Sequence, residues 1–491
     1  MAGMSPRSRA FLGIDLGTTN IKVQLVTERG MIVSSGSAPV GITYGADGAA
    51  EQDMENIWRG TCAAIKQAVD AGAGSEVAAI GISSQGGALQ VLDAAGRCSG
   101  PVIGWQDSRG APWDRGLSDR LGARWFTRHA GRTYCTSAPG QILRLREQGN
   151  LPQGFQLGWV GDLVVQRLCG RRAHDATSLS LAGLCNPTSG REDAELLAEL
   201  GLERPQLPDL LSADHAAGGL LPGIASDLLL PAGIPVGPAV HDQYAAATGC
   251  GAVRAGDNML GAGTAWVLLA ISDTAGVPVD GAGLVGRHVV SGIHGHMLAM
   301  ANGGACLSWV LRTLNLGDKG IVEVDALMST IPSGCAGLRF LPLLSEEGGH
   351  GLRRGSEGRL DGLRLRHTAA HIVRALVEGL ACELGRYLAM MAEGGVAVSR
   401  LVMCGKAAAS SVTPRIIADT AGLPVDCVTI PETSSLGAAV FARSLVEPGT
   451  GLVALSDAMK PPVNGIDPGS GMAEARGRLQ EYLASCRAMI T

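Results

Sequence analysis

The sequence predicts an α/β fold built as two domains that face a central cleft, and three observations carry this expectation. The chain has 491 residues, more than a single hydrophobic core usually organises. Patterns of buried strands alternate along it with patterns of amphipathic helices. A strand, a glycine-rich turn and a second strand occur at residues 11–26 and recur at residues 257–272. This recurrence indicates two α/β domains, which we place at residues 1–247 and 248–491.

The first half opens with a predicted hairpin, FLGIDLGTTNIKVQLV (11–26), followed by a predicted helix, MENIWRGTCAAIKQAV (54–69). The apolar positions that predict the helix share one face: Ile57, Cys62, Ile65 and Val69. The segment VAAIGISSQGGALQVLD (77–93) predicts a buried strand, a glycine turn and another strand. A strand end and loop, GPVIGWQDSRG (100–110), come next, and a more helical region follows.

The second half repeats this pattern with the hairpin DNMLGAGTAWVLLAIS (257–272). Residues 367–391 predict a long amphipathic helix with apolar residues at steps of four: Ile372, Leu376, Leu380 and Leu384. The segment SRLVMCGKAAASS (399–411) predicts a strand, a turn and a helix, and SLGAAVFARSLV (435–446) predicts a further helix. Because no low-complexity segment separates the halves, we expect a hinge made of packed elements.

Composition and charge exclude several classes of protein. The net charge of −5 offers no basic surface, so no nucleic-acid partner is expected. The 12 cysteines are scattered singly, without CxxC or Cys/His spacing, which predicts free thiols rather than a zinc site or disulfides. No stretch approaches the roughly 20 apolar residues of a membrane span, and the amino terminus lacks a signal-peptide core. We therefore expect a soluble, cytoplasmic protein without a membrane partner.

The glycine hairpins carry groups that hold an anion. Successive glycine turns direct backbone N–H groups at an anion, and the hydroxyls of Thr18 and Thr19 add donors. Asp15, at the end of the first strand, suits Mg²⁺, which takes few carboxylates and keeps its waters. Together these groups predict a nucleotide triphosphate held between the two halves. The alternative is an ordinary β-turn, in which Gly and Asn are favoured anyway. The sequence holds no GxxxxGK[ST], which excludes a P-loop.

A family resemblance rests on several stretches taken in order. GIDLGTTN (13–20) resembles the ATP-binding opening of the superfamily of actin, hexokinase and the heat-shock chaperones. The following stretches resemble segments of the FGGY carbohydrate kinases, which include xylulokinase-like and glycerol kinase-like members: AAEQDMENIW, GWQDSRG, NGGACLSWVL, LRFLPLL, GPAVHDQYAAATGCGAV, and LVMCGKAAASSVTPRIIADTAGLPV with SLGAAVFA. The likeness extends over about residues 10–445. It implies two ribonuclease-H-like, actin-like ATPase domains and ATP-dependent phosphorylation of a sugar hydroxyl.

The resemblance implies a role for each matching residue. The residues implied to bind the nucleotide are Gly17, Thr18 and Thr19 at the β- and γ-phosphates, Gly263 and Thr264 in the opposing hairpin, and Gly405 and Ala408 beside the adenosine. Asp15 would belong to the magnesium shell, and Asp242 would be the catalytic base. The residues implied to bind the substrate are Gln85, Gly86, Gly87, Trp105, Asp107 and Gln243.

The chemistry of phosphoryl transfer is consistent with an aspartate base. A sugar hydroxyl barely ionises at neutral pH, so a carboxylate within hydrogen-bonding reach must accept its proton as the O–P bond forms. Asp242 also precedes the predicted helix QYAAATGC, so it has a second interpretation as a helix cap. We expect His241 to be structural. Trp105 has two interpretations, as a stacking surface for a sugar and as a core residue.

The sequence departs from the family pattern at two places. Xylulokinase-like members present Met-His after the glutamine at position 85, and glycerol kinases present Arg-Glu, whereas this chain has Gly86 and Gly87. A wall without side chains recognises substrate through its backbone or leaves more room. Glycerol is therefore disfavoured, and a ketose or polyol of about five carbons, such as the pentulose xylulose, is preferred. In the adenosine segment, the usual second glycine is Lys406, which either crowds the adenine or adds charge near the phosphates.

Two alternatives to a sugar kinase stay open from the sequence. A chaperone-like or filament-type ATPase shares the first hairpin but has no use for GWQDSRG or HDQYAAA. A degenerate kinase that binds sugar without phosphoryl transfer is suggested by Lys406. The implied partners are a small sugar or polyol together with ATP and Mg²⁺. The sequence does not fix the oligomeric state, and a homodimer is one arrangement it allows.

Overall fold

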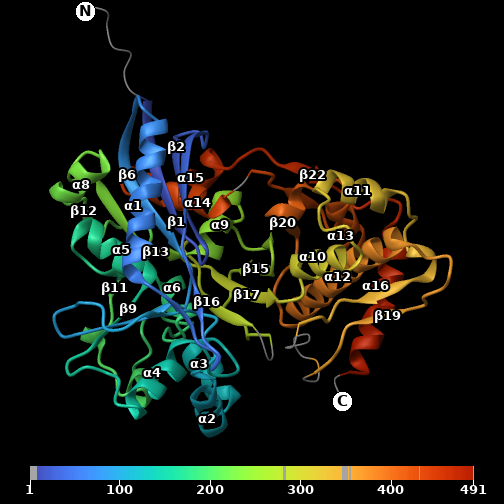
Figure 1. The fold of residues 1–491 in the computed structure, drawn as a ribbon, viewed down its shortest axis with the longest axis horizontal. Coiled ribbons are helices and arrows are strands. Elements are labelled where there is room, and N and C mark those ends of the chain that lie inside the picture. Colours follow the sequence, from blue (N-terminus) through green and yellow to red (C-terminus); the bar gives the residue numbers. More distant parts are fainter. Residues whose placement is uncertain (1–7, 280–282, 346–351, 353–354, 431, 490–491) are drawn as a thin grey trace, which may run out of the picture. The chain divides into compact units, whose positions relative to one another are not determined.

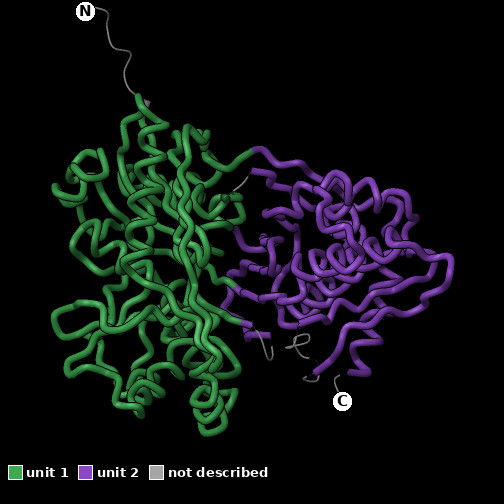
Figure 2. The backbone as a smooth tube through the Cα atoms, in the orientation of Figure 1, with its two compact units in different colours: residues 1–253, 284–295, 432–461 green, residues 254–283, 296–431, 462–491 purple. Residues whose placement is uncertain are grey.

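The structure is a computed structural model that describes residues 8–279, 283–345, 352, 355–430 and 432–489. It divides into two compact units, neither of which is a single stretch of chain (Figure 2). Unit 1 comprises residues 1–253, 284–295 and 432–461, and unit 2 comprises residues 254–283, 296–431 and 462–491. The expected boundary at 247/248 lies close to the end of the first segment of unit 1, and unit 1 also takes in two later segments of the chain.

Unit 1 is organised around a mixed sheet whose main strand order is β11-β10-β13-β6-β1-β2-β3 (Figure 1). The strands are β1 Ser8–Leu16, β2 Asn20–Thr27, β3 Ile32–Pro39, β6 Ser75–Ser84, β10 Ala173–His174, β11 Asp209–Leu210 and β13 Pro235–His241, with β12 Gly218–Gly219 beside β13. Strands β1, β2 and β3 form an antiparallel meander, whereas β6 runs parallel to both β1 and β13. The predicted hairpin at residues 11–26 is therefore the β1–β2 pair.

Helix α14 (Thr433–Ser444) joins unit 1 from far along the chain and packs against β1, β6 and α9 (Asp242–Cys250). The contact is so close that it requires glycine. A Cβ at Gly437 would lie 1.8 Å from the carbonyl oxygen of Ala245, and a Cβ at Gly13 would lie 1.9 Å from that of Ser435. These distances leave no room for a side chain, so the helix lies directly on the backbone of its neighbours.

Helix α1 (Met54–Ala71) confirms the predicted helix but shifts its apolar face. Ile57 and Ile65 are buried as expected, whereas Cys62 and Val69 are only half-buried. The buried face is completed by small residues: Thr61, Ala64 and Ala68. Further helices of unit 1 are α5 Val160–Cys169, α6 Ala176–Leu181, α7 Ala194–Glu199, α8 Pro222–Leu228 and α15 Leu452–Met459. Strand β16 spans Leu284–Arg287.

A second, smaller sheet in unit 1 has the order β4-β5-β8-β7-β9. Its strands are β4 Thr43–Tyr44, β5 Ala50–Gln52, β7 Leu89–Leu92, β8 Val102–Ile103 and β9 Gln156–Trp159. The neighbouring helices are α2 Ala111–Leu121, α3 Ala123–Ala130 and α4 Ala138–Glu147. Buried residues of this sheet and these helices, such as Leu89, Ile103, Phe126 and Ile142, form a core of their own. This core supports the GWQDSRG loop that follows β8.

Unit 2 has a sheet in which β17-β15-β14-β20-β21-β22 are neighbours. The strands are β14 Asp257–Ala262, β15 Trp266–Ser272, β17 His294–Met300, β20 Arg400–Cys404, β21 Val425–Cys427 and β22 Asn464–Ile466. A separate pair is β18 Arg339–Leu341 with β19 Arg359–Asp361. The helices are α10 Gly304–Thr313, α11 Ile321–Ser329, α12 Ala369–Glu393, α13 Thr413–Ala421 and α16 Met472–Arg487.

The two main sheets follow the same plan. The order β3-β2-β1-β6-β13 in unit 1 corresponds to β17-β15-β14-β20-β21 in unit 2. In both, the hairpin strands are antiparallel, and the first of them is parallel to the next strand of the series. The recurrence of the glycine hairpin in the sequence is therefore the visible part of a repeated fold. Within the described residues, no helix has the length and apolar character needed to cross a membrane.

Candidate active site

Three parallel strand ends bring the polar groups of unit 1 together. In the registers of β1, β6 and β13, Asp15 lies opposite Ser83, and Ser84 lies opposite His241. Adjacent parallel strands end at the same edge of a sheet, so the residues at these carboxyl ends become neighbours. Asp15, Gln85 and Asp242, which are far apart in the sequence, are thus gathered at one edge of the sheet.

Asp15 is a buried carboxylate with few donors. Its side chain accepts a hydrogen bond from the Ser83 hydroxyl at 2.8 Å, and the residue is 8% exposed. Burial, followed by the negative charge of Asp242, raises the pKa of Asp15 to about 7. The Ser83 hydrogen bond and the cation of Lys22 oppose this rise, but Lys22 is itself paired with Glu432. Among the described residues, the negative charge of the Asp15 carboxylate is therefore not balanced by a nearby cation that is free to interact with it.

Asp242 is the first residue of α9, and the N-cap position belongs to His241. Of the two roles considered for Asp242, the structure therefore does not make it the N-cap, although a carboxylate in the first turn is favoured by the helix dipole. Gln243 donates to the Asp242 carboxylate from its side chain and its backbone N–H. Burial nevertheless raises the pKa of Asp242 to about 6. The Nε2 atom of His241 lies 3.2 Å from Oδ1 of Asp242.

The turn between β1 and β2 depends on Gly17, because a Cβ there would lie 2.7 Å from the carbonyl oxygen of Asn20. Thr18 is half-buried and accepts two hydrogen bonds from other parts of unit 1. Its carbonyl accepts from Nε2 of Gln52 at 2.9 Å, and its hydroxyl accepts from Nε1 of Trp105 at 3.0 Å. Thr19 is exposed. Trp105 is 56% exposed, so the core interpretation of this residue is wrong.

The segment Gln85–Gly86–Gly87 follows β6. Gln85 is buried and donates through Nε2 to Oε1 of Gln52 at 3.0 Å. The Oε1 atom of Gln85 is buried without a partner among the described residues. Gly87 has a φ of +76°, which favours glycine, whereas Gly86 does not have a positive φ. Gln52, which links Gln85 to Thr18, lies in the stretch AAEQDMENIW, which was noted from the sequence as a whole without singling out this residue.

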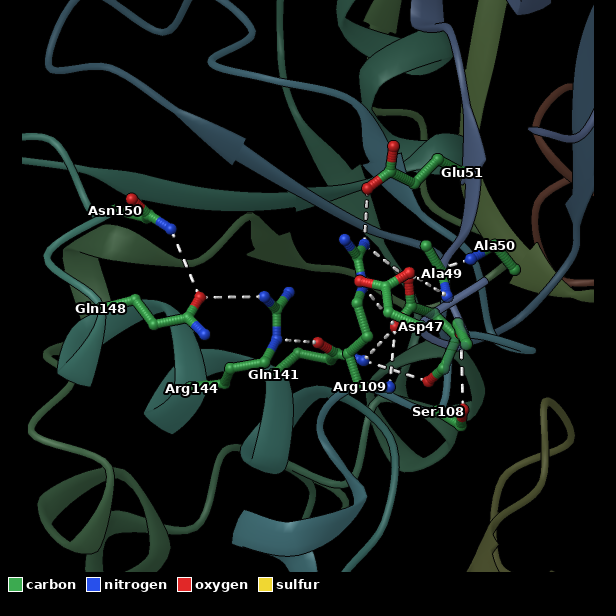
Figure 3. Close-up of polar contacts among 12 residues, drawn as sticks. Asp47, Ala49, Ala50, Glu51, Ser108, Arg109, Gln141, Arg144, Gln148 and Asn150 are labelled. Carbon is green, nitrogen blue, oxygen red and sulfur yellow. Dashed lines mark hydrogen bonds and ion pairs between the residues drawn. The ribbon is translucent and has the colours of Figure 1, made fainter. Parts of the chain in front are cut away.

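Asp107 is committed to a hydrogen-bond network within the protein, and Figure 3 shows the neighbouring polar contacts around Arg109 and Gln141. Its side chain is fully buried and accepts from the backbone N–H of Ala50, from the Nε2 of Gln141, and from both the backbone and the guanidinium of Arg109. Burial raises the pKa of Asp107, but the hydrogen bonds led by that of Arg109 outweigh it and hold the pKa below its usual value. Arg109 also pairs with Glu51, a second residue that the sequence did not single out.

This network fixes the shape of the GWQDSRG loop. A carboxylate offers about four lone-pair positions, and those of Asp107 are occupied by protein donors. A direct contact between Asp107 and a substrate stays a prediction. Gln243 is likewise engaged, since its side chain donates to Asp242.

The corresponding edge of unit 2 carries the second hairpin. Gly263 and Thr264 connect β14 to β15, and the Thr264 carbonyl accepts from the backbone N–H of Ala305 in α10. Gly304 is required there, because a Cβ would lie 2.3 Å from the carbonyl oxygen of Gly263. Gly405, at the end of the neighbouring strand β20, has a φ of +87° and approaches the backbone of Ala262. The two glycine turns of unit 2 are therefore neighbours.

Two other residues of this segment have contrasting positions. Ala408 is 3% exposed and belongs to the core of unit 2, so its side chain is engaged in packing. Lys406 is exposed at the start of the short 3₁₀ helix Lys406–Ala409. Its side chain is therefore not packed into the core of unit 2.

The repeated sheet, the glycine turns and the paired carboxylates define a phosphotransferase of the actin-like ATPase class. Comparison with known proteins narrows this class. The model of the N-terminal domain of the FGGY family of carbohydrate kinases matches residues 10–249, and that of the C-terminal domain matches residues 238–444. The chain therefore belongs to the FGGY family of carbohydrate kinases, which use ATP to phosphorylate an alcohol group.

Individual relatives align over nearly the whole chain. The glycerol kinase of Thermus brockianus is 30% identical over 469 residues, which cover 91% of each protein. The xylulose kinase of Escherichia coli K12 is 26% identical over 456 residues, which cover 91% of this chain and 92% of that one. A crystal structure of xylulose kinase from Rhodospirillum rubrum matches with a TM-score of 0.87 at 24% identity, over 98% of this chain and 99% of that one.

These comparisons confirm the predicted family, the mixed α/β fold with two actin-like domains, and the class of enzyme. They favour the sugar-kinase branch over the chaperone-like or filament-type ATPase that the sequence also allowed. Relatives with two different substrates match at similar identity, so the comparisons support a sugar or polyol substrate without choosing between them.

Proposed function

We propose that this FGGY kinase transfers the γ-phosphoryl group of ATP to a hydroxyl of a ketose or polyol, a pentulose such as xylulose being preferred, with Asp242 as the general base. The observation that carries the proposal is the raised pKa of Asp242 at the edge it shares with Asp15. A carboxylate with a pKa of about 6 is ionised at neutral pH yet more basic than an ordinary aspartate.

Asp242 accepts the proton of the attacking hydroxyl as the new O–P bond forms and the bond from phosphorus to the leaving ADP oxygen breaks. The residues around it support this step. Gln243 holds the carboxylate through two donors, and the helix dipole of α9 favours its ionised form before the proton arrives. The remainder of the catalysis is alignment of the hydroxyl with phosphorus.

The chemistry of the donor set fits Mg²⁺. The raised pKa of Asp15 reflects a buried carboxylate near a second carboxylate and without sufficient positive charge, which a cation would supply. Mg²⁺ needs only one or two carboxylates when phosphates complete its shell. Asp15 would hold the ion, which neutralises charge on the phosphates when bound. Gly17, Thr18, Thr19, Gly263, Thr264, Gly405 and Ala408 stay assigned to the nucleotide.

The substrate preference follows from the wall at residues 85–87. This wall has no counterpart of the Arg-Glu pair expected in a glycerol kinase, and two of its three residues are glycine. The Oε1 atom of Gln85 is a buried acceptor without a partner among the described residues, which is an unfavourable state worth about 1–3 kcal/mol. A sugar hydroxyl that donates to this oxygen would relieve the cost, which favours a polyhydroxylated substrate.

A coupled assay of ADP release over pentuloses, hexuloses, tetritols, pentitols and glycerol tests the proposal. We expect the largest kcat/KM with a pentulose and at least 100-fold less ADP release with Asp242→Asn, while calorimetry shows that the variant still binds ATP and sugar. Turnover of Asp242→Asn close to that of the wild type would contradict the base assignment. ATP binding without ADP release from any substrate would instead favour the degenerate kinase.

A further inference from the structure

His241 is placed so that its imidazole faces the carboxylate of Asp242. It is the last residue of β13, and its backbone N–H donates to the hydroxyl of Thr177 at 3.1 Å, which fixes the strand end. The side chain is 5% exposed, and its Nε2 lies 3.2 Å from Oδ1 of Asp242. The Nδ1 atom has no hydrogen-bond partner among the described residues.

The imidazole is neutral throughout the working range of an enzyme. Burial, assisted by the positive charge of Arg132, lowers the pKa of His241 to about 3. A neutral imidazole carries one proton, and the carboxylate of Asp242 is an acceptor, so the proton belongs on Nε2. The Nε2 atom of His241, 3.2 Å from Oδ1 of Asp242, is thus placed to act as a hydrogen-bond donor rather than as a cation or a second base.

Gly86 is the residue that makes room for this imidazole. A Cβ at position 86 would lie 2.6 Å from Cδ2 and 2.8 Å from Nε2 of His241, and 2.8 Å from Cγ of Leu181. Real Cβ contacts are not this short, so any side chain at position 86 would displace the ring. Gly86 has no positive φ, so its backbone does not require glycine, in contrast to Gly87 at +76°. Space for the side chains of His241 and Leu181, with the shortest distance to His241, is therefore the physical reason for glycine at position 86.

We propose that His241 is a positioning residue for the base Asp242, and that Gly86 is the space that admits its imidazole. The proposal rests on the proposed function, in which Asp242 accepts the substrate proton. The Nε2–H group of His241 holds one rotamer of the carboxylate, so that the carboxylate meets the reacting hydroxyl without first reorienting. The proton passes from the hydroxyl to Asp242, and His241 keeps its own proton. In this chain, residues from the ends of β6 and β13 together build the wall beside the base.

A structural role is the competing explanation, because the ring of His241 also packs edge-on against Tyr244, with centroids 6.0 Å apart. The two roles differ in their measurable effects. Loss of packing lowers stability and leaves kcat unchanged in the protein that remains folded. Loss of positioning lowers kcat while the dissociation constants of sugar and ATP stay the same.

The test compares His241→Met, which fills the space without a donor, with His241→Gln, whose amide nitrogen can replace Nε2–H. We expect His241→Met to lose about 10- to 100-fold in kcat, the scale of a misplaced catalytic group. His241→Gln should stay within about fivefold of wild type, and sugar and ATP dissociation constants should stay within about twofold for both. His174→Met is the matched control, because His174 is also a buried histidine at the end of a strand of the same sheet.

Gly86→Ala tests the same contact from the other side. It should lower kcat in the wild-type background but add less than about threefold to the loss in His241→Ala, because the ring it displaces is then absent. Additive losses would show that Leu181 is the obstacle and would overturn the role of Gly86.

Asp242→Asn is measured alongside, so that a failure of the proposed base Asp242 can be distinguished from a failure of the positioning role of His241. An active Asp242→Asn contradicts the proposed function itself. An inactive Asp242→Asn together with a wild-type kcat in folded His241→Met overturns only the positioning role. Loss of kcat in His241→Gln equal to that in His241→Met also overturns it, because the donor would then be irrelevant.

Discussion

Replacing Asp242 by Asn should stabilise the ligand-free protein at neutral and alkaline pH, in addition to its effect on transfer. Asn has nearly the shape of Asp, and its side-chain oxygen can still accept from His241 and Gln243. The substitution therefore removes mainly the charge. Burial is the largest cause of the raised pKa of Asp242, so the charge is what the folded protein tolerates poorly.

The sign of the pH dependence follows from linkage. The pKa of Asp242 is about 6 in the folded protein against an ordinary value of 3.8, so the folded state binds this proton more tightly. The stability contributed by the protonated carboxyl is present at low pH and is lost as pH rises from about 4 to about 6. Two pKa units correspond to an upper limit of about 3 kcal/mol. Because the side chain is 27% exposed, solvent screening reduces the expected difference to about 1–2 kcal/mol.

Calorimetric melting of the wild type and Asp242→Asn at pH 5, 6, 7 and 8, without ligands, measures this difference. A domain of this size gains roughly 2–4 °C in Tm per kcal/mol, so the variant should melt several degrees higher at pH 8. The gap should narrow toward pH 5. Asp70→Asn, which changes an exposed carboxylate of the same unit, serves as the control and should show no such trend. A Tm of Asp242→Asn at or below that of wild type at pH 8 would refute the reasoning.

Two further substitutions test the packing and the loop contacts. Gly437→Ala places a Cβ 1.8 Å from the carbonyl oxygen of Ala245 and should destabilise unit 1 by about 2 kcal/mol or more in urea denaturation. The control is Gly477→Ala, on an open face of α16, which should leave the stability unchanged or raise it by up to about 1 kcal/mol. Equal effects at the two positions would contradict the close contact. Trp105→Phe removes the Nε1 hydrogen bond to Thr18 but keeps an aromatic ring at this position. This substitution should raise the KM for substrate or ATP about threefold or more, with little change in Tm. Unchanged KM values would show that this hydrogen bond has no role in binding.

The sequence predicts those features of the fold that have a local cause. The hairpin at Gly17–Thr19 is marked by its turn residues, and its recurrence at Gly263–Thr264 indicates the repeated sheet. The long helix α12 is marked by its apolar spacing, and three of its four predicted positions are buried: Leu376, Leu380 and Leu384. Ile372, in the first turn, is only half-buried because the helix begins there.

Features that depend on contacts between residues far apart in the sequence were not predictable. Helix α14 is buried on nearly every side, so its sequence has no polar face to indicate which sheet it covers. It belongs to unit 1 because glycines on β1 and β6, at Gly13 and Gly81, let its backbone approach. Gln52 and Glu51 escaped notice for a related reason. The stretch AAEQDMENIW that contains them was noted only as a whole, and their roles depend on hydrogen bonds to Thr18 and Arg109, which lie elsewhere in the chain.

Two different physical requirements explain the glycines at the site: a positive φ angle at some positions and a lack of space for a side chain at others. This difference determines which of these positions can accept another residue. Gly87 and Gly405 adopt positive φ angles, so a side chain at either position strains the backbone wherever its atoms point. Gly86 has no positive φ and is glycine because the side chains of His241 and Leu181 occupy the adjacent space. A larger residue at position 86 is therefore compatible with the backbone once position 241 becomes small and the side chain of Leu181 shifts. We expect the two positions to change together when the sugar-binding wall is redesigned, since either change alone leaves a clash or a void beside the base.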